Sequence, residues 1–270
     1  MRLVVENLSV RYPHNTQNAA TVRDVNLNVA AGQLVVIVGP NGCGKSTLLR
    51  AIARLQPPCA GQIRVDGSDV WQLSPRQAAH SIALLPQSPL APEGITVTDL
   101  VRYGRHPHQS WLKQWSAHDQ TVVEDAMAAC NVSDLAEQRL ERLSGGQRQR
   151  CWLAMILAQA APLMLLDEPI SMLDLGHQIE VLSLAQRLTR QGASIVMVLH
   201  DLIAAARYAD VLVAMQDGQI VAQGAPRDIV TPALVQSLYG VQADILSAPI
   251  DGSPVVVPSA LSHNIQVALP

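Results

Sequence analysis

Short apolar runs separated by turn residues occupy the N-terminal part of the chain, up to about residue 85. Runs of roughly four to eight such residues are typical of β-strands. The strands that they predict are Leu3 to Val10, Asn26 to Val29, Leu34 to Gly39, Ile63 to Asp66 and Ile82 to Leu85. Glycines such as Gly32 and Gly67 lie between the runs and favour turns.

Apolar residues recur at helical spacing between about Pro89 and Arg142, for example over Val97 to Arg102 and Thr121 to Ala129. This change of period predicts a helical lobe. Strands return at Leu163 to Asp167 and at Ser194 to His200, each after a helical stretch. That alternation is typical of a parallel sheet whose strands are joined by crossover helices.

The C-terminal part of the chain gives two different signals. Asp217-Gly218 separates the apolar runs Val211 to Gln216 and Gln219 to Val221, which predicts a β-hairpin with a tight turn. After about Gln236 the chain gains prolines and shows no helical period. We expect a loosely packed tail there, with the last ten or so residues disordered.

Composition narrows the class of protein without changing this outline. A content of 49% hydrophobic and 15% charged residues over 270 positions suits a globular α/β chain with a sizeable core. Phenylalanine is absent and aromatic residues make up 3%, so the core must be aliphatic. The net charge of -3 gives no overall basic field, so nucleic acid is not expected as a partner.

Neither a secretory signal nor a membrane-spanning helix is predicted. The N-terminal residues lack a basic region followed by an apolar run. The uncharged stretch Cys151 to Leu166 is shorter than the roughly 20 residues that a span needs, so it predicts a buried helix, a turn and a buried strand. The four cysteines show no metal-site spacing, and we expect reduced thiols in the cytosol.

The first chemical motif is a phosphate-binding loop between an apolar strand and a leucine-rich helix. It reads Gly39-Pro40-Asn41-Gly42-Cys43-Gly44-Lys45-Ser46 and fits the pattern G-x-x-x-x-G-K-[ST]. Glycines let backbone N–H groups wrap phosphate oxygens, and Lys45 supplies a cation to the β- and γ-phosphates. The Ser46 hydroxyl is a candidate Mg²⁺ ligand, and Thr47 would lie near the α-phosphate.

Cys43 within this loop has two interpretations. Its place in a glycine-rich loop that opens a helix favours the reactive thiolate. The alternative is a small side chain that fills a small space. In either case, modification of Cys43 is expected to block ATP binding.

Two carboxylates follow the apolar strand that ends at Asp167. Charges at such a position are unfavourable for stability unless a cation or a proton needs them there. Asp167 is therefore the expected Mg²⁺ partner, through water, and Glu168 is placed to polarise the water that attacks the γ-phosphate.

The pentapeptide Leu143-Ser144-Gly145-Gly146-Gln147 provides a second glycine pair that opens a helix, and so a second anion-binding surface. One chain cannot close both surfaces on one ATP. The sequence therefore predicts a head-to-tail homodimer in which Ser144, Gly145, Gly146 and Gln147 cover the nucleotide of the partner.

Together these motifs resemble, in order and spacing, the ATP-binding subunits of ABC transporters over about residues 3 to 235. Asp167-Glu168-Pro169, Ser171 to Asp174 and His200-Asp201 complete the series. The resemblance implies roles for further residues. Gln87 would sense Mg²⁺ and the attacking water, Asp174 would cross the dimer interface, His200 would contact the γ-phosphate and Tyr12 would stack on adenine.

The resemblance implies an α/β fold: a P-loop ATPase core with an N-terminal antiparallel β region and an inserted helical subdomain. Residues 1–235 would form the ATPase domain, about 89–150 the helical insertion and 236–270 a C-terminal tail. ATP and Mg²⁺ are the implied cofactors. The implied partners are a second copy, integral membrane permease subunits and, indirectly, a solute-binding protein, with the chain at the cytoplasmic face of the bacterial inner membrane.

Further segments resemble the importer ATPases that serve ferric siderophores, heme and cobalamin, and the siderophore members are nearest. They are Gly94 to Val97, Gly104 to His108, Leu157 to Gln159 and Leu173 to Gln178. His106, His108 and His118 are expected to be exposed loop histidines of the permease-facing lobe. An assembly scaffold, for instance for iron-sulfur clusters, and an exporter subunit stay open as alternatives.

The stretch from Gly94 to His108 is expected to receive a short cytoplasmic helix of the permease. On that hypothesis Val101→Glu would uncouple transport from hydrolysis. If Val101 belongs to the core instead, the variant would misfold.

Overall fold

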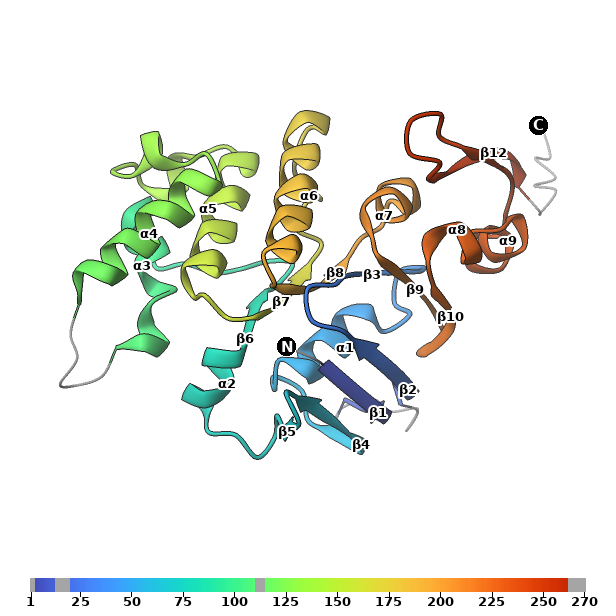
Figure 1. Cartoon of the computed structure of the whole chain (residues 1–270), viewed down its shortest axis with the longest axis horizontal. Coiled ribbons are helices and arrows are strands. Elements are labelled where there is room, and N and C mark those ends of the chain that lie inside the picture. The colour runs from blue at the N-terminus through green and yellow to red at the C-terminus, as the bar shows by residue number, and fades with distance from the viewer. Residues whose placement is uncertain (1–2, 13–19, 110–114, 262–270) are drawn as a thin grey trace, which may run out of the picture.

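The structure is a computed structural model of the chain, and it describes residues 3–12, 20–109 and 115–261. Its main sheet has six strands in the order β10-β9-β3-β8-β7-β6 (Figure 1). All pairs along it are parallel except β10 with β9. The strands are β3 (Leu34–Val38), β6 (Ile82–Leu85), β7 (Leu163–Asp167), β8 (Ser194–Val198), β9 (Val211–Gln216) and β10 (Gln219–Gly224).

A second sheet, of order β2-β1-β4-β5, is antiparallel and confirms the predicted N-terminal β region. Its strands are β1 (Leu3–Val10), β2 (Val22–Val29), β4 (Pro58–Val65) and β5 (Ser68–Asp69). β2 and β4 begin earlier than predicted. Exposed polar residues, such as Arg23 and Asp24 in β2, break the apolar run from which the strand was predicted.

The helices connect the parallel strands and form the helical lobe. They are α1 (Lys45–Ile52), α2 (Pro75–Ser81), α3 (Val97–Tyr103), α4 (Ala117–Ala129), α5 (Gly145–Ala158), α6 (Leu175–Arg190) and α7 (Leu202–Tyr208), with short 3-10 turns η1 (His106–His108), η2 (Ser133–Leu135) and η3 (Leu140–Arg142). In Figure 1, α3, α4 and α5 gather at one end of the molecule, beyond β6, at the edge of the six-stranded sheet. The segment after β6 is therefore helical as predicted.

The hydrophobic core has two layers, one on each face of the six-stranded sheet. Strand β3 shows how one apolar run serves both layers, because all five of its residues are buried. Leu34 and Val36 pack with the helices on one face, whereas Val35 and Ile37 pack with α1 and the antiparallel sheet on the other. Both faces of the sheet are thereby covered by apolar layers. A ligand therefore reaches the sheet most readily at the ends of its strands.

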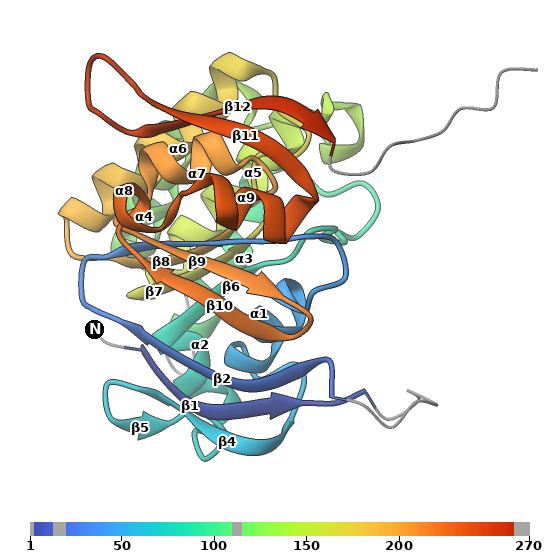
Figure 2. The ribbon, with the colours of Figure 1, turned by 90° about the vertical axis from the view of Figure 1, so that its right-hand side faces the viewer.

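The expectation of a loosely packed C-terminal tail is wrong for residues 241–261. After α8 (Pro226–Ile229) and α9 (Pro232–Tyr239), β11 (Val241–Ser247) and β12 (Pro254–Leu261) pair as an antiparallel hairpin. The hairpin covers α7 and α9, opposite the N-terminal sheet (Figure 2). Ala243 and Val256 join the core. The alternation of inward and outward side chains along these strands therefore predicts their structure better than the prolines do. The predicted disorder of the last ten or so residues falls mostly on 262–270, outside the described residues.

Candidate active site

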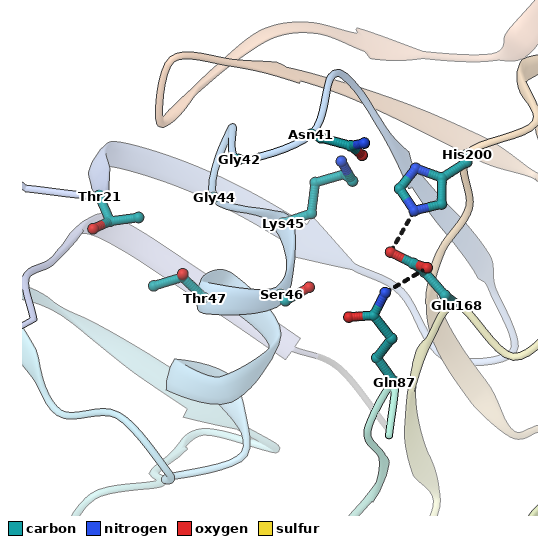
Figure 3. A pocket seen from close by; sticks show the side chains of 10 residues that line it. All are labelled: Thr21, Asn41, Gly42, Gly44, Lys45, Ser46, Thr47, Gln87, Glu168 and His200. Carbon is teal, nitrogen blue, oxygen red and sulfur yellow. Dashed lines mark hydrogen bonds and ion pairs between the residues drawn. The ribbon is translucent and has the colours of Figure 1, made fainter. Parts of the chain in front are cut away.

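The predicted phosphate-binding and acidic residues meet where the parallel strands end at their carboxyl termini. In open α/β sheets, ligands bind in the crevice outside these strand ends. A pocket of ≈ 440 Å³ lies there (Figure 3). It is lined by Thr21, Asn41, Gly42, Gly44, Lys45, Ser46, Thr47, Gln87, Glu168 and His200.

The loop after β3 depends on glycine for its path. A Cβ atom on Gly39 would lie 2.0 Å from the carbonyl oxygen of Met215 in β9, closer than any side chain allows. Gly39 has a φ of 146° and Gly44 a φ of 104°, both outside the usual range of other residues. The loop therefore passes tightly over the sheet, and its last two residues, from Lys45 on, already belong to α1.

Lys45 bridges the loop from within. Its ammonium group donates to the carbonyl oxygens of Gly39 at 2.8 Å and Pro40 at 2.9 Å, and the residue is only 5% exposed. Because it also lines the pocket, the same group is available to phosphate oxygens. The loop holds its cation in place before any ligand arrives.

Hard oxygen donors face each other beside the loop. The Ser46 hydroxyl donates to Oδ1 of Asp167 at 3.0 Å, and Asp167 is 2% exposed at the end of β7. Burial raises the pKa of Asp167, and the bond from Ser46 opposes this shift. A hydroxyl and a carboxylate in contact are donors of the type that Mg²⁺ prefers, so these residues fit that ion.

Glu168 is held by both of its carboxylate oxygens. Gln87 donates from Nε2 to Oε2 at 2.8 Å, and Nε2 of His200 pairs with Oε1 (Figure 3). Glu168 has a φ of 54°, a left-handed conformation that is rare and costly for a residue with a side chain. The structure thus brings together three of the predicted site residues, one from the end of each of the strands β6, β7 and β8.

Tyr12 and Thr21 lie beside the loop and the start of α1, and of the two only Thr21 lines the pocket. The Tyr12 hydroxyl is 3.3 Å from Oγ1 of Thr47, which places the tyrosine beside the start of α1. Thr21 lines the pocket, although sequence reasoning missed it because it belongs to no motif. Only its position directly before β2, opposite the predicted loop, could have indicated it.

The glycine pair of the pentapeptide 143–147 opens α5, as predicted. Ser144 caps the helix by accepting from the backbone of Gln147 at 3.2 Å, and the Gln147 side chain accepts from the Ser144 N–H. Residues Ser144, Gly145, Gly146 and Gln147 do not line the pocket among the described residues. In a single chain, therefore, the two candidate anion surfaces stand apart.

Asp174 is also outside the pocket and caps α6. It accepts from the backbone N–H of His177 at 3.0 Å, and its carboxylate contacts Nδ1 of the same histidine at 2.8 Å. Its side chain is 70% exposed. Met172, two residues before Asp174, lies next to Gly145 of the pentapeptide. The exposed carboxylate of Asp174 is therefore available to a partner molecule.

The interpretation of Cys43 as a reactive thiolate is wrong. Cys43 is 5% exposed, and burial raises the pKa of its thiol despite Lys45, whose Nζ lies 3.9 Å from Sγ. A Cβ atom on Gly39 would come within 3.1 Å of this sulfur. The small thiol fills a small space under the loop, and desolvation outweighs the nearby cation.

We expect iodoacetamide to alkylate exposed Cys59 well before Cys43, because only the thiolate reacts and burial keeps the Cys43 thiol protonated. Mass spectrometry of the labelled protein over time measures both rates. Activity should be lost with the slow modification, and Mg-ATP should retard labelling of Cys43 while leaving Cys59 unchanged. Faster labelling of Cys43 than of Cys59 would contradict this assignment.

The loop histidines do not form a metal site. His108 bonds through Nε2 to the carbonyl oxygen of Gln159 at 2.8 Å and contacts the ring of His80, whereas His106 and His118 are exposed. Within the described residues, no group of three or more His, Cys, Asp or Glu side chains is arranged to hold a metal ion. The expectation of solvent-facing loop histidines holds for His106 and His118 only.

A strand, a glycine-rich loop that holds a lysine, a helix, and an acidic strand end beside a positioned glutamate together define a P-loop ATPase. Residues 22–171 match the ABC transporter family, which is more than half of the chain. The chain belongs to this family. It is an ATP-binding subunit that hydrolyses ATP.

Particular proteins agree with this assignment. The chain is 44% identical to the ferric enterobactin transport ATP-binding protein FepC of Escherichia coli, over 95% of this chain and 94% of that protein. A solved inward-facing metal-chelate type ABC transporter matches with a TM-score of 0.81 and 30% identity, covering 96% of this chain and 97% of the other. The dimeric cassette MJ0796, solved with ADP and Pi, matches with a TM-score of 0.75 and 25% identity, covering 83% and 98%.

No helix in the part of the chain that the structure describes is long and apolar enough to cross a membrane. Import subunits of this family work with permease subunits, and cassettes of the family form dimers.

Proposed function

We propose that the chain powers the import of an iron chelate, a ferric siderophore, through a separate permease at the cytoplasmic face of the bacterial inner membrane, with a solute-binding protein delivering the chelate. The similarity to an enterobactin transport subunit over nearly the whole of both chains carries this proposal. The similarity to a metal-chelate type transporter supports it. No residue of the nucleotide pocket selects a chelate, so selection would belong to the partners.

For the chemistry, we propose that Glu168 polarises the water that attacks the γ-phosphate. His200 and Gln87, which hold both oxygens of Glu168, would orient this carboxylate and contact the γ-phosphate and the water. Lys45 and the loop 39–46 would bind the phosphates, Thr47 the α-phosphate, and Tyr12 the adenine.

Mg²⁺ fits the donors at Ser46 and Asp167, with Gln87 nearby. When bound, the ion would neutralise charge on the β- and γ-phosphates. Ser46 would hold it through the hydroxyl, Gln87 through the amide oxygen, and Asp167 through water.

The working unit would be a head-to-tail homodimer. Ser144, Gly145, Gly146 and Gln147 open α5, where the first backbone N–H groups of a helix have no intrahelical partner, and they do not reach the pocket of their own chain. Closing two chains on each other would bring this cap to the partner's γ-phosphate. Asp174, exposed at the start of α6, would cross the same interface. ATP binding would close the dimer, and hydrolysis would reopen it.

We retain the division into an ATPase domain of residues 1–235 with a helical insertion at about 89–150. The structure supports α3, α4 and α5 as one packed group. The boundary after residue 235 falls inside α9, so the segment 236–270 would not separate cleanly from the domain.

We propose that the permease helix docks in a groove of ≈ 460 Å³, which lies in the stretch from Gly94 to His108 that was expected to receive it. Its lining includes Pro92, Glu93, Gly94, Ile95, Asp99, Arg102, Tyr103, His106, Gln109 and Trp115. Tyr103 is 51% exposed, and Arg102 lies over the ring of Trp115 at 5.1 Å. Exposed aromatic and arginine side chains are the residues that interfaces favour.

Val101 does not belong to this groove. It is 0% exposed and packs in the core, so the expectation that Val101→Glu reports on docking is wrong. The helical period placed Val101 on α3, but it could not tell the buried face of the helix from the groove face. A buried glutamate there would cost several kcal/mol and destabilise the lobe.

Tyr103→Glu in the groove should therefore uncouple hydrolysis from chelate uptake, while the melting temperature and ATP affinity of the isolated subunit stay at the wild-type values. Uptake and ATPase rates of the reconstituted complex measure the effect. Val101→Glu serves as the comparison, because it should lower the melting temperature. Wild-type uptake by the Tyr103 variant would remove the groove from the docking surface.

Growth tests the substrate class. A deletion strain should fail to grow with a ferric siderophore as the only iron source, and the wild-type chain, but not an inactive variant, should restore growth. Uptake of labelled heme and cobalamin by the same strain distinguishes the alternatives. Unimpaired siderophore uptake in the deletion strain would overturn the proposal.

A further inference from the structure

The short turn η1 lies between the groove and the far end of α5. His106 and the preceding Tyr103 line the groove. On its other side, the same turn contacts the last residues of α5 and the connection from α2 to β6. The contacts are made by buried or half-buried polar groups that the ATPase chemistry does not use.

Arg105 makes the first of these contacts. Its Nε donates to Oδ1 of Asp119 in α4 at 2.9 Å, and its Nη1 donates to the carbonyl oxygen of Ala158, the last residue of α5, at 2.8 Å. Arg105 is 3% and Asp119 4% exposed. Bonds to Ser116 and then Arg105 lower the pKa of Asp119 to about 2, so the pair stays charged. A cation at the carbonyl end of a helix is the favoured arrangement.

Gln159 makes the second contact. Its Nε2 donates to the carbonyl oxygens of Ala79 at 2.7 Å and Ile82 at 2.9 Å, which joins the end of α5 to α2 and β6. Its own carbonyl oxygen contacts Nε2 of His108 at 2.8 Å. One residue therefore ties three segments that are far apart in the sequence.

Two further contacts leave the turn little freedom. Nε of Arg76 in α2 donates to the carbonyl oxygen of Pro107 at 3.0 Å. A Cβ atom on Gly104 would lie 2.2 Å from the carbonyl oxygen of Met155, so α3 ends in direct backbone contact with α5. Movement of the groove wall must displace either this turn or α5.

A displacement of the groove wall can pass along helix α5 to the other end of the lobe. Its 14 residues span about 21 Å, with Ser144 capping one end and Gln159 the other. A helix of this length moves as a unit, because its backbone hydrogen bonds are internal.

We propose that Arg105 and Gln159 are positioning residues that couple occupation of the groove to the orientation of the glycine pair at the start of α5. The proposal rests on the proposed docking of a permease helix in the groove. It adds that the signal passes through the carbonyl end of α5, and neither residue touches the nucleotide.

The test uses the full chain reconstituted with its permease and Gln159→Met, which keeps the length of the side chain but removes its donors. Basal ATPase activity, ATP affinity and KM for ATP should match the wild type. Stimulation of kcat by the permease should fall at least about fivefold, the lower bound of typical coupling energies. Gln120→Met, on the exposed face of α4, is the matched control and should leave stimulation intact.

Arg105→Lys is the second variant, because lysine keeps the charge but cannot bond Asp119 and Ala158 in the same fork. It should give the same selective loss. If both variants lower basal activity and melting temperature in proportion, or if both are stimulated normally, the coupling role is overturned. If the wild-type chain is not stimulated by the permease, the proposed function fails first, and that result is separate from either variant.

Discussion

Replacing Glu168 by glutamine is expected to lower the rate of ATP hydrolysis by about 10² to 10⁴, the usual contribution of a positioned general base. The amide has the shape of the carboxylate, and its oxygen still accepts from Gln87. The phosphate loop bonds Lys45 and not Glu168, so ATP should bind as in the wild type. The dimer should then remain closed on ATP.

Single-turnover hydrolysis, ATP titration and the oligomeric state by light scattering measure the three parts of this prediction. Glu137→Gln, an exposed carboxylate in the helical lobe, controls for loss of a negative charge and should be fully active. Near wild-type turnover in the Glu168 variant would assign the base to another residue.

Lys45→Ala is expected to act earlier, at binding. The variant loses the only described cation that bonds the loop carbonyls from inside, at Gly39 and Pro40. Loss of a hydrogen bond to a charged group costs about 1.5–3 kcal/mol, so affinity for ATP should fall roughly 10- to 100-fold. Hydrolysis should then be strongly reduced at ATP concentrations that just saturate the wild type.

Comparing nucleotides locates the effect of Lys45. Because we assign its contacts to the β- and γ-phosphates, the loss of affinity should be larger for ATP than for ADP. Because the carbonyl groups of Gly39 and Pro40 lose their donor in this variant, its melting temperature is measured as well, which distinguishes weaker binding from unfolding. Equal losses for ATP and ADP would mean that Lys45 holds the loop and does not contact the γ-phosphate.

The sequence predicted the loop, the acidic strand end and the central strands well, because their chemistry or burial restricts the residues at each position. Lys45, Ser46 and Asp167 are of the residue types that a site for phosphate and Mg²⁺ favours, and β3 is apolar throughout because both of its faces are buried. Gln87 and His200 were identified through resemblance. Their meeting at Glu168 depends on which strands are neighbours, and no single motif states that order.

The errors have a common physical origin in burial. Helical period assigned Val101 to a helix without saying which neighbours cover it, and α4 and α5 cover the face that carries it. Desolvation decides the pKa of Cys43, and it depends on how closely the folded loop packs over the thiol, for example at Gly39. The hairpin of β11 and β12 is stabilised by contacts with α7 and α9. The sequence does not show these contacts, and its prolines favoured the prediction of a loose tail.

The position of β3 inside its sheet has a consequence for how the chain folds during synthesis. Its two neighbours are β8 and β9, whose residues begin at Ser194 and Val211. Strands β1, β2 and β4 of the N-terminal sheet can pair once Val65 has emerged, but β3 then has no partner strand for nearly half of synthesis. Pairings of such long sequence separation form slowly. The nascent chain therefore displays an exposed aliphatic strand next to an unformed nucleotide loop, and chaperone binding in that interval would limit the yield of active subunit.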